Sequence, residues 1–153
     1  MHKGKRVAIV TVVLVAAAQL IRPSHEDPPT DPSRTLAAQG EWAIGVAAVV
    51  DRSCRDCHTN TTVWPWFAQI APFSWLMAYG VTQGRNIVNF SEWATYTPEK
   101  QRELLVASCR DARNGRMPGH YALVQPQTRL SPQDIETICA AAKRANASGP
   151  GVL

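Results

Sequence analysis

The stretch Cys54-Arg55-Asp56-Cys57-His58 decides the fold of this 153-residue chain. It has the pattern CxxCH, in which two thiols lie about one helical turn apart and an imidazole follows the second. Each thiol can form a thioether with a vinyl group on one edge of a porphyrin, and the histidine is then placed to bind the iron. With 4 cysteines and 4 histidines in the chain, chance would produce the pattern roughly 0.003 times. The motif therefore predicts one covalently attached haem c, held by Cys54, Cys57 and His58.

Three other interpretations of the motif are weaker. A zinc site requires further ligands at paired spacing, and the other two cysteines, Cys109 and Cys139, stand alone. A thioredoxin-like redox pair requires a βαβ context, which the sequence lacks. A structural disulfide would leave the adjacent histidine without a role.

The composition indicates one globular domain with an apolar leader. Hydrophobic residues make up 45% of the chain and charged residues 18%, a composition that excludes a disordered chain. The length of 153 residues favours one domain over a multidomain enzyme. The net charge of +4 depends on Lys3, Lys5 and Arg6, which precede the apolar run. No cluster of basic residues interleaved with aromatic ones occurs, so nucleic-acid binding is not predicted.

Residues 1–21 have the features of an export signal. Fifteen uncharged residues, Val7 to Ile21, follow the basic prefix and would rise roughly 22 Å as a helix, against a hydrocarbon core of about 30 Å. Ala16-Ala17-Ala18 suits a signal peptidase, but no polar region precedes it, so we favour an uncleaved anchor over a cleaved signal. In both cases the rest of the chain crosses the inner membrane of a bacterium and lies in the periplasm.

The remaining chain divides into a tether and an all-α domain. Residues 22–39 hold four prolines and no periodicity, which predicts an extended tether, and the domain is expected over residues 40–147. Apolar periodicity predicts helices over residues 42–53 and, less regularly, 72–88. Thr97-Pro98 and Ser131-Pro132 are start signals for two more, ending at Asn114-Gly115 and fraying over residues 146–149.

Further motifs follow CxxCH in order: Asn60, Trp64-Pro65-Trp66-Phe67, Ala71-Pro72, Ser74-Trp75, Asn89-Phe90-Ser91-Glu92-Trp93, Met117-Pro118, Tyr121 and Arg129-Leu130-Ser131. With them, residues 19–145 resemble the bacterial haem-binding domain family of small single-haem c-type cytochromes. The resemblance implies a cytochrome c-like helical domain wrapped around one haem, facing the periplasm and anchored at its N-terminus. Gln125 stands where many members have histidine, which weakens that position as an iron ligand.

The second axial ligand is predicted to be Met117. It lies in a loop between two predicted helices, and a methionine there suits a strap over the open face of the haem. His120 is the alternative ligand, and ordinary apolar packing of Met117 is the third interpretation. Met77 lies on a predicted helix among apolar residues, so core packing explains it better.

Three tryptophans, Trp64, Trp66 and Trp75, are candidates for the wall of the haem pocket, where an indole N–H can donate to a propionate. Aromatic core packing is an equal alternative for each. Arg85 can pair a propionate, although an exposed surface arginine is the more common case. A backbone carbonyl near Pro65 is expected to accept from Nδ1 of His58.

Cys109 and Cys139 each fall on the inward stripe of a predicted helix. In an oxidising compartment they are expected to form a disulfide, with two unpaired buried thiols as the alternative. The chain as a whole is predicted to carry electrons between redox partners and not to be an enzyme. The alternatives are a haem-based gas or peroxide sensor, a small peroxidase-like protein, or a haem subunit of a larger respiratory complex.

Overall fold

The computed structural model describes residues 3–147 and contains helices but no strand over that range. The all-α prediction is therefore confirmed. The α-helices are α1 (Lys3–Ala18), α2 (Glu41–Ser53), α3 (Arg55–His58), α4 (Phe73–Ile87), α5 (Pro98–Arg113), α6 (Tyr121–Val124) and α7 (Pro132–Ala147). Short 3₁₀ helices connect them: η1 (Pro32–Arg34), η2 (Leu36–Ala38), η3 (Trp66–Gln69), η4 (Phe90–Thr95) and η5 (Pro126–Thr128).

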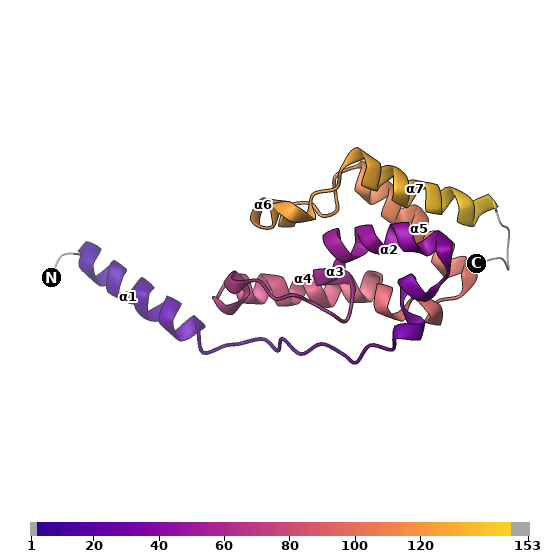
Figure 1. Ribbon diagram of the computed structural model, residues 1–153. Helices are drawn as coiled ribbons and strands as arrows, with labels where there is room; N and C mark the ends of the chain where they lie inside the picture. Colours follow the sequence, from indigo (N-terminus) through magenta and orange to yellow (C-terminus); the bar gives the residue numbers. More distant parts are fainter. Residues whose placement is uncertain (1–2, 148–153) are drawn as a thin grey trace.

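The helices form layers around α2. The pair α5 and α7 lies on one side of α2, and α3 with α4 lies on the other (Figure 1). The main core combines side chains of α2, α5 and α7 with Trp93 of η4, which has no exposed surface. Part of this core, including Val50 and Leu105, also lines the site described below.

Two helices begin at the caps that the sequence predicts. The Thr97 hydroxyl oxygen accepts from the Lys100 backbone N–H at 3.3 Å, and α5 starts at Pro98. Ser131 and Asp134 form a reciprocal cap, because the Asp134 carboxylate accepts from the Ser131 N–H and hydroxyl while the Ser131 oxygen accepts from the Asp134 N–H. The start signals for α5 and α7 are therefore confirmed; of the predicted fraying over 146–149, residues 148 and 149 lie outside the described range.

The structure joins Cys109 of α5 to Cys139 of α7 in a disulfide, with Cα atoms 4.8 Å apart. Both residues lie on the inward stripes that the periodicity indicates, which brings the two thiols together where the helices pack. Cys54 and Cys57 remain free thiols. The cysteines of this chain therefore divide into one bonded pair and one pair facing the site.

The proline-rich segment differs from the expected tether. Leu36 is 2% exposed and belongs to the main core, so the compact domain begins before residue 40. The segment from Ser24 to Asp31 lies along the domain, and its polar groups accept hydrogen bonds from the loop after the CxxCH motif. Residues 22–31 have no regular structure, whereas the rest of the segment forms the short 3₁₀ helices η1 and η2. The absence of periodicity carried no information about these tertiary contacts.

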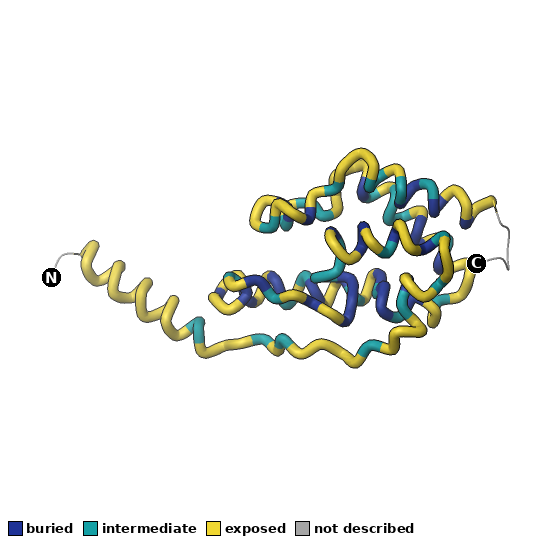
Figure 2. Tube along the Cα trace, in the orientation of Figure 1, coloured by how far each residue is buried: buried dark blue, intermediate teal, exposed yellow. Residues whose placement is uncertain are grey.

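Helix α1 projects from the domain and has no buried residue (Figures 1 and 2). The predicted apolar segment is helical as far as Ala18, residues 19 and 20 form a turn, and Ile21 has no assigned structure. Within residues 3–147 no helix combines the length and apolar character needed to cross a membrane. Residues 1 and 2 of the predicted signal lie outside the described range.

Candidate functional site

A cavity of about 330 Å³ opens between α2, α4 and α5. Its size is that of a small-molecule or cofactor site. The walls are mostly apolar, with Val46, Val50, Phe90, Leu104, Leu105 and Ile138 among the lining residues. Cys54, Cys57 and His58 all lie in the wall of this same cavity.

The CxxCH motif forms one tight helical turn. Cys54 ends α2, and its carbonyl oxygen accepts from the N–H groups of Cys57 at 3.3 Å and of His58 at 3.0 Å. Helix α4 packs directly against this turn, because a Cβ on Gly84 would lie 2.2 Å from the Cys57 carbonyl oxygen. Only glycine permits that approach. The contact between α3 and α4 therefore fixes where the two thiols and the imidazole lie.

The His58 ring is oriented by a backbone carbonyl. Its Nδ1 lies 3.1 Å from the oxygen of Val88, the residue that follows α4, and donates its proton there. Nε2 is then left unprotonated as a metal ligand. Burial lowers the pKa of His58 below its ordinary value, which also favours the neutral ring. The expected carbonyl near Pro65 was wrong, because the partner comes from a segment thirty residues further along the chain.

Both thiols of the motif are protonated at neutral pH. Burial raises the pKa of Cys54 to about 12, with a further contribution from Cys57. It raises the pKa of Cys57 to about 11, and the neighbouring Asp56 adds to the shift. A redox-active CxxC pair has a thiol pKa lowered below its usual value. The environment of these thiols is the opposite of that required for such a pair.

Met117 and His120, the two candidates for the second iron ligand, lie in different surroundings. Met117 lines the cavity and is 43% exposed, whereas His120 is exposed and is not part of the lining. The Met117 loop turns at Gly115 and Gly119, which have φ of 66° and 57°. The structure thus brings Met117, and not His120, to the same cavity as His58.

A hydrogen bond that the sequence did not suggest links the Met117 segment to the motif. The Tyr121 hydroxyl donates to Oδ2 of Asp56 at 2.7 Å, and both residues line the cavity. Burial first, and then the Asp56 carboxylate, raise the pKa of Tyr121, so the phenol stays protonated and remains a donor. Tyr121 belongs to the motifs that carry the family resemblance, but its partner could be found only from the fold.

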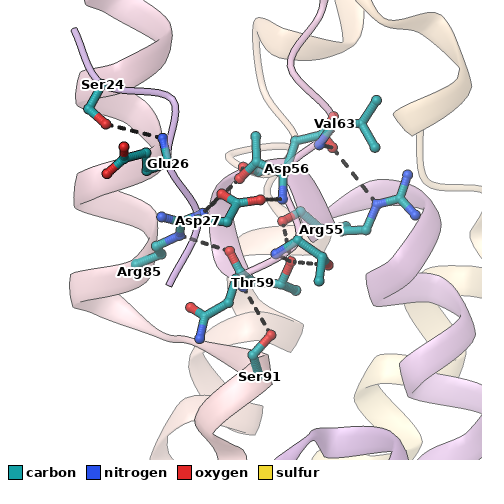
Figure 3. A network of polar contacts seen from close by, with 12 residues as sticks. Ser24, Glu26, Asp27, Arg55, Asp56, Thr59, Val63, Arg85 and Ser91 are labelled. Carbon is teal, nitrogen blue, oxygen red and sulfur yellow. Dashed lines mark hydrogen bonds and ion pairs between the residues drawn. The ribbon is translucent and has the colours of Figure 1, made fainter. Parts of the chain in front are cut away.

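The loop after the motif is held by Arg85 of α4 (Figure 3). The Arg85 guanidinium donates to the Thr59 carbonyl at 2.8 Å and pairs with Asp27 of the proline-rich segment. The other Asp27 oxygen accepts from the Thr62 N–H at 2.8 Å. Arg85 is thus neither an exposed surface arginine nor a residue facing the cavity. It ties the exit of the CxxCH turn to the N-terminal segment.

Asn60 holds the same loop from the other side. Its backbone N–H donates to the Ser91 hydroxyl at 2.9 Å, and its side-chain oxygen accepts from the amide of Asn89 at 2.7 Å. The Asn60 amide donates to the Pro29 carbonyl at 3.2 Å. The motif residues Asn60, Asn89 and Ser91 therefore act together to position the segment that follows His58.

None of the tryptophans predicted as pocket walls lines the cavity. Trp66 is 76% exposed, Trp75 donates its indole N–H to the Ile21 carbonyl at 2.8 Å, and Trp64 stacks on His25 with ring centroids 4.0 Å apart. The structure therefore does not bring these three tryptophans to the cavity lining, and their contact with a haem stays a prediction. The apolar walls come instead from α2, α5 and α7, together with Ile87 of α4 and Phe90 of η4.

An all-helical domain with CxxCH in the wall of an apolar cavity has the features of a haem-binding protein. Residues 12–144 match the sequence model of the haem-binding domain family, so the chain belongs to that family. Comparison with curated proteins and with solved structures gave no match.

The residues present fit a haem. Two free thiols and an imidazole with a free Nε2 share one wall, and the remaining walls are apolar. A bare metal ion is a poorer fit, because no three His, Cys, Asp or Glu side chains gather as ligands within residues 3–147. Cys54, Cys57 and His58 would hold the haem, with Met117 at the same cavity.

Proposed function

We propose that this protein is an exported single-haem c-type cytochrome that carries one electron between redox partners. The observation that carries the proposal is the geometry of His58: Nδ1 is bonded to the Val88 carbonyl, and the ring lies in the same cavity wall as Cys54 and Cys57. A histidine fixed in this way is prepared as an iron ligand, and the two thiols beside it supply covalent attachment.

The haem, when bound, supplies an iron that changes between the ferrous and ferric states. The protein determines which state is favoured. Methionine as the second ligand raises the reduction potential relative to a second histidine. The apolar walls, which include Val50 and Leu105, disfavour the more highly charged ferric state. Tyr121 and Asp56 hold the segment that carries Met117 next to the cavity.

The proposed location is the periplasmic side of a bacterial inner membrane. The basic residues Lys3, Lys5 and Arg6 precede an apolar helix, which is the arrangement of an export signal. The Cys109–Cys139 disulfide suits an oxidising compartment. Attachment through α1 keeps the domain near the membrane, where its redox partners, or a larger respiratory complex that includes it, would be found.

Covalent attachment is tested by mass spectrometry of the purified, denatured protein. We expect the chain to retain the mass of one haem, and the Cys54→Ser, Cys57→Ser double variant to lose it on denaturation. Haem that separates from the parent chain on unfolding would contradict the c-type assignment.

Coordination is tested by spectra with and without carbon monoxide. The electron carrier should be low-spin, six-coordinate and indifferent to carbon monoxide. Met117→Ala should lose the weak methionine-to-iron charge-transfer band of the ferric protein and bind carbon monoxide. His120→Ala is the matched control and should keep both properties of the parent.

A second function is favoured by one observation. Met117 is 43% exposed and lies in a loop that turns at two glycines. A ligand in such a loop can dissociate, which would let a gas or a peroxide reach the iron. High-spin iron that binds carbon monoxide readily in the parent protein would support this sensor or peroxidase-like function and contradict the electron carrier.

A further inference from the structure

The segment that runs from η3 into α4 exposes several large apolar side chains. Trp66 of η3 is 76% exposed, and Leu76 and Tyr79 of α4 are 65% and 66% exposed. Phe73, at the start of α4, and Ile70, between η3 and α4, are exposed as well. We call these five residues the aromatic face. Scattered exposed apolar residues are normal on soluble domains, but a contiguous group indicates an interaction surface.

The surrounding sequence has no charge. Residues 59–84 contain no Asp, Glu, Lys or Arg, although the domain elsewhere carries charges of both signs. A surface that binds a protein partner usually has a polar, solvent-accessible rim. This face has no charged residue within its own segment, which favours an apolar environment with a polar boundary, such as a lipid bilayer.

Helix α4, which carries part of the aromatic face, begins next to the end of α1 (Figure 1). The Gln19 side chain accepts from the Ala71 N–H at 3.0 Å and donates to the Ala71 carbonyl at 3.3 Å. Trp75 donates to the Ile21 carbonyl at 2.8 Å. These three hydrogen bonds attach the residues that follow α1 to the residues between η3 and α4. The exposed apolar residues Leu20 and Ile21, which directly follow α1, are thus tied to the segment that carries the aromatic face.

We propose that the aromatic face lies in the headgroup region of a lipid bilayer beside α1, so that the domain contacts the membrane at a second place. Tryptophan and tyrosine favour this region because each combines an apolar ring with a polar group. Apolar area and aromatic side chains together give interfacial binding. The proposal goes beyond the proposed function, because an electron carrier attached by α1 alone does not require its domain to touch lipid.

The proposal fixes the orientation of the haem cavity. Helix α4 carries Leu76 and Tyr79 on the aromatic face, and its next turns contribute Gly80, Gln83 and Ile87 to the cavity lining. The domain would therefore rest on the membrane along the helix that borders the site. The cavity would stay at a fixed height above the lipid instead of moving freely on the N-terminal segment.

The test places one nitroxide label on the full-length holoprotein in phospholipid nanodiscs. Leu76→Cys provides the probe, and Ile44→Cys, a 60% exposed apolar residue on α2, is the matched control. Accessibility is measured with oxygen, which concentrates in lipid, and with a water-soluble nickel chelate. We expect the ratio of oxygen to nickel accessibility to be severalfold higher at position 76 than at position 44.

Two results would overturn the proposal. Equal ratios at the two positions would show that the face lies in water. Low accessibility of position 76 to both reagents would show that protein covers it, either a second copy or a partner. Phe73→Glu, added to the labelled Leu76→Cys chain, should lower the ratio to the value at position 44, whereas Ile44→Glu should not. An unchanged ratio with Phe73→Glu would also contradict lipid contact.

The outcome is independent of the haem assignment. The haem spectrum is recorded on each labelled sample and shows whether the domain is folded. If haem were not covalently attached, Cys54 and Cys57 would take up additional labels, which mass spectrometry counts. A failure of membrane contact and a failure of the cytochrome assignment are thus seen separately.

Discussion

The Tyr121 hydroxyl donates to the Asp56 carboxylate at 2.7 Å and so connects the two sides of the cavity. Asp56 lies within the CxxCH turn, and Tyr121 begins the helix that follows the Met117 loop. The position of the Met117 loop therefore depends on the same turn that holds His58. Since hydrogen bonds to a charged partner are among the stronger ones, this link contributes about 1.5–3 kcal/mol.

Tyr121→Phe should loosen the Met117 loop without removing any ligand. The ring remains, but the Asp56 carboxylate loses its phenol donor. We expect the methionine-to-iron band of the ferric protein to disappear at a lower urea concentration than in the parent, by about 1–2 kcal/mol in the free energy of ligand loss. Tyr79→Phe, an exposed tyrosine, is the control. Equal behaviour of the two variants would mean that the Asp56 bond does not hold the loop.

The sequence predicted those features that depend on local pattern. CxxCH needs only one helical turn, and the inward positions of Cys109 and Cys139 follow from helical periodicity. Both features lie in the structure where the pattern placed them. Met117, predicted as an iron ligand from its residue type and its place between two helices, lies in the lining of the cavity, and its role as a ligand stays a prediction.

The features that depend on tertiary contact could not be predicted. The Val88 carbonyl carries no side-chain signal, and its role arises only because α4 ends beside His58. The surroundings of the tryptophans, none of which lines the cavity, could not be predicted because an aromatic cluster has the same sequence signature whether it faces a cofactor or the outside. Arg85 and Asp27 are 58 residues apart, and nothing in either segment indicates that they pair.

Gly84→Ala should destabilise the domain at the motif. The added Cβ would lie 2.2 Å from the Cys57 carbonyl oxygen, so α3 and α4 must separate. We expect a loss of about 3 kcal/mol in the free energy of unfolding and a lower yield of haem-loaded protein. Urea unfolding followed by circular dichroism measures the first, and the haem absorbance per chain measures the second.

Gly45→Ala is the matched control for that substitution. Gly45 lies inside α2, and a Cβ there meets only the Thr137 methyl group at 3.4 Å. Alanine favours the helix by up to about 1 kcal/mol relative to glycine. The control should therefore be as stable as the parent or slightly more stable. Similar losses for both variants would show that the approach of α4 to Cys57 is not the cause.

The Cys109–Cys139 disulfide should stabilise the domain through the loop that it closes. The two residues are 30 positions apart, for which restriction of the unfolded chain predicts about 3–4 kcal/mol. The Cys109→Ala, Cys139→Ala double variant should lose about that amount in urea unfolding and still bind haem. Reductant should lower the stability of the parent to that of the variant and leave the variant unchanged. A parent that does not respond to reductant would contradict the bond.

Asp134 should make the stability depend on pH in the acid range. The Arg52 guanidinium, 2.6 Å away, and the Ser131 hydroxyl lower the pKa of Asp134 to about 2. Because the folded pKa is below that of the unfolded chain, the stabilisation is complete above about pH 4 and is lost as the pH falls toward 2.

Asp134→Asn should cost about 1–2 kcal/mol at neutral pH, and the difference from the parent should shrink through this window. Asp51, whose side chain is 70% exposed, provides the control, and Asp51→Asn should have almost the same free energy of unfolding as the parent at any pH. Urea unfolding of all three proteins across this pH range measures both effects. A difference between Asp134→Asn and the parent that stays constant down to about pH 2 would mean that the Arg52 pair does not hold the Asp134 charge.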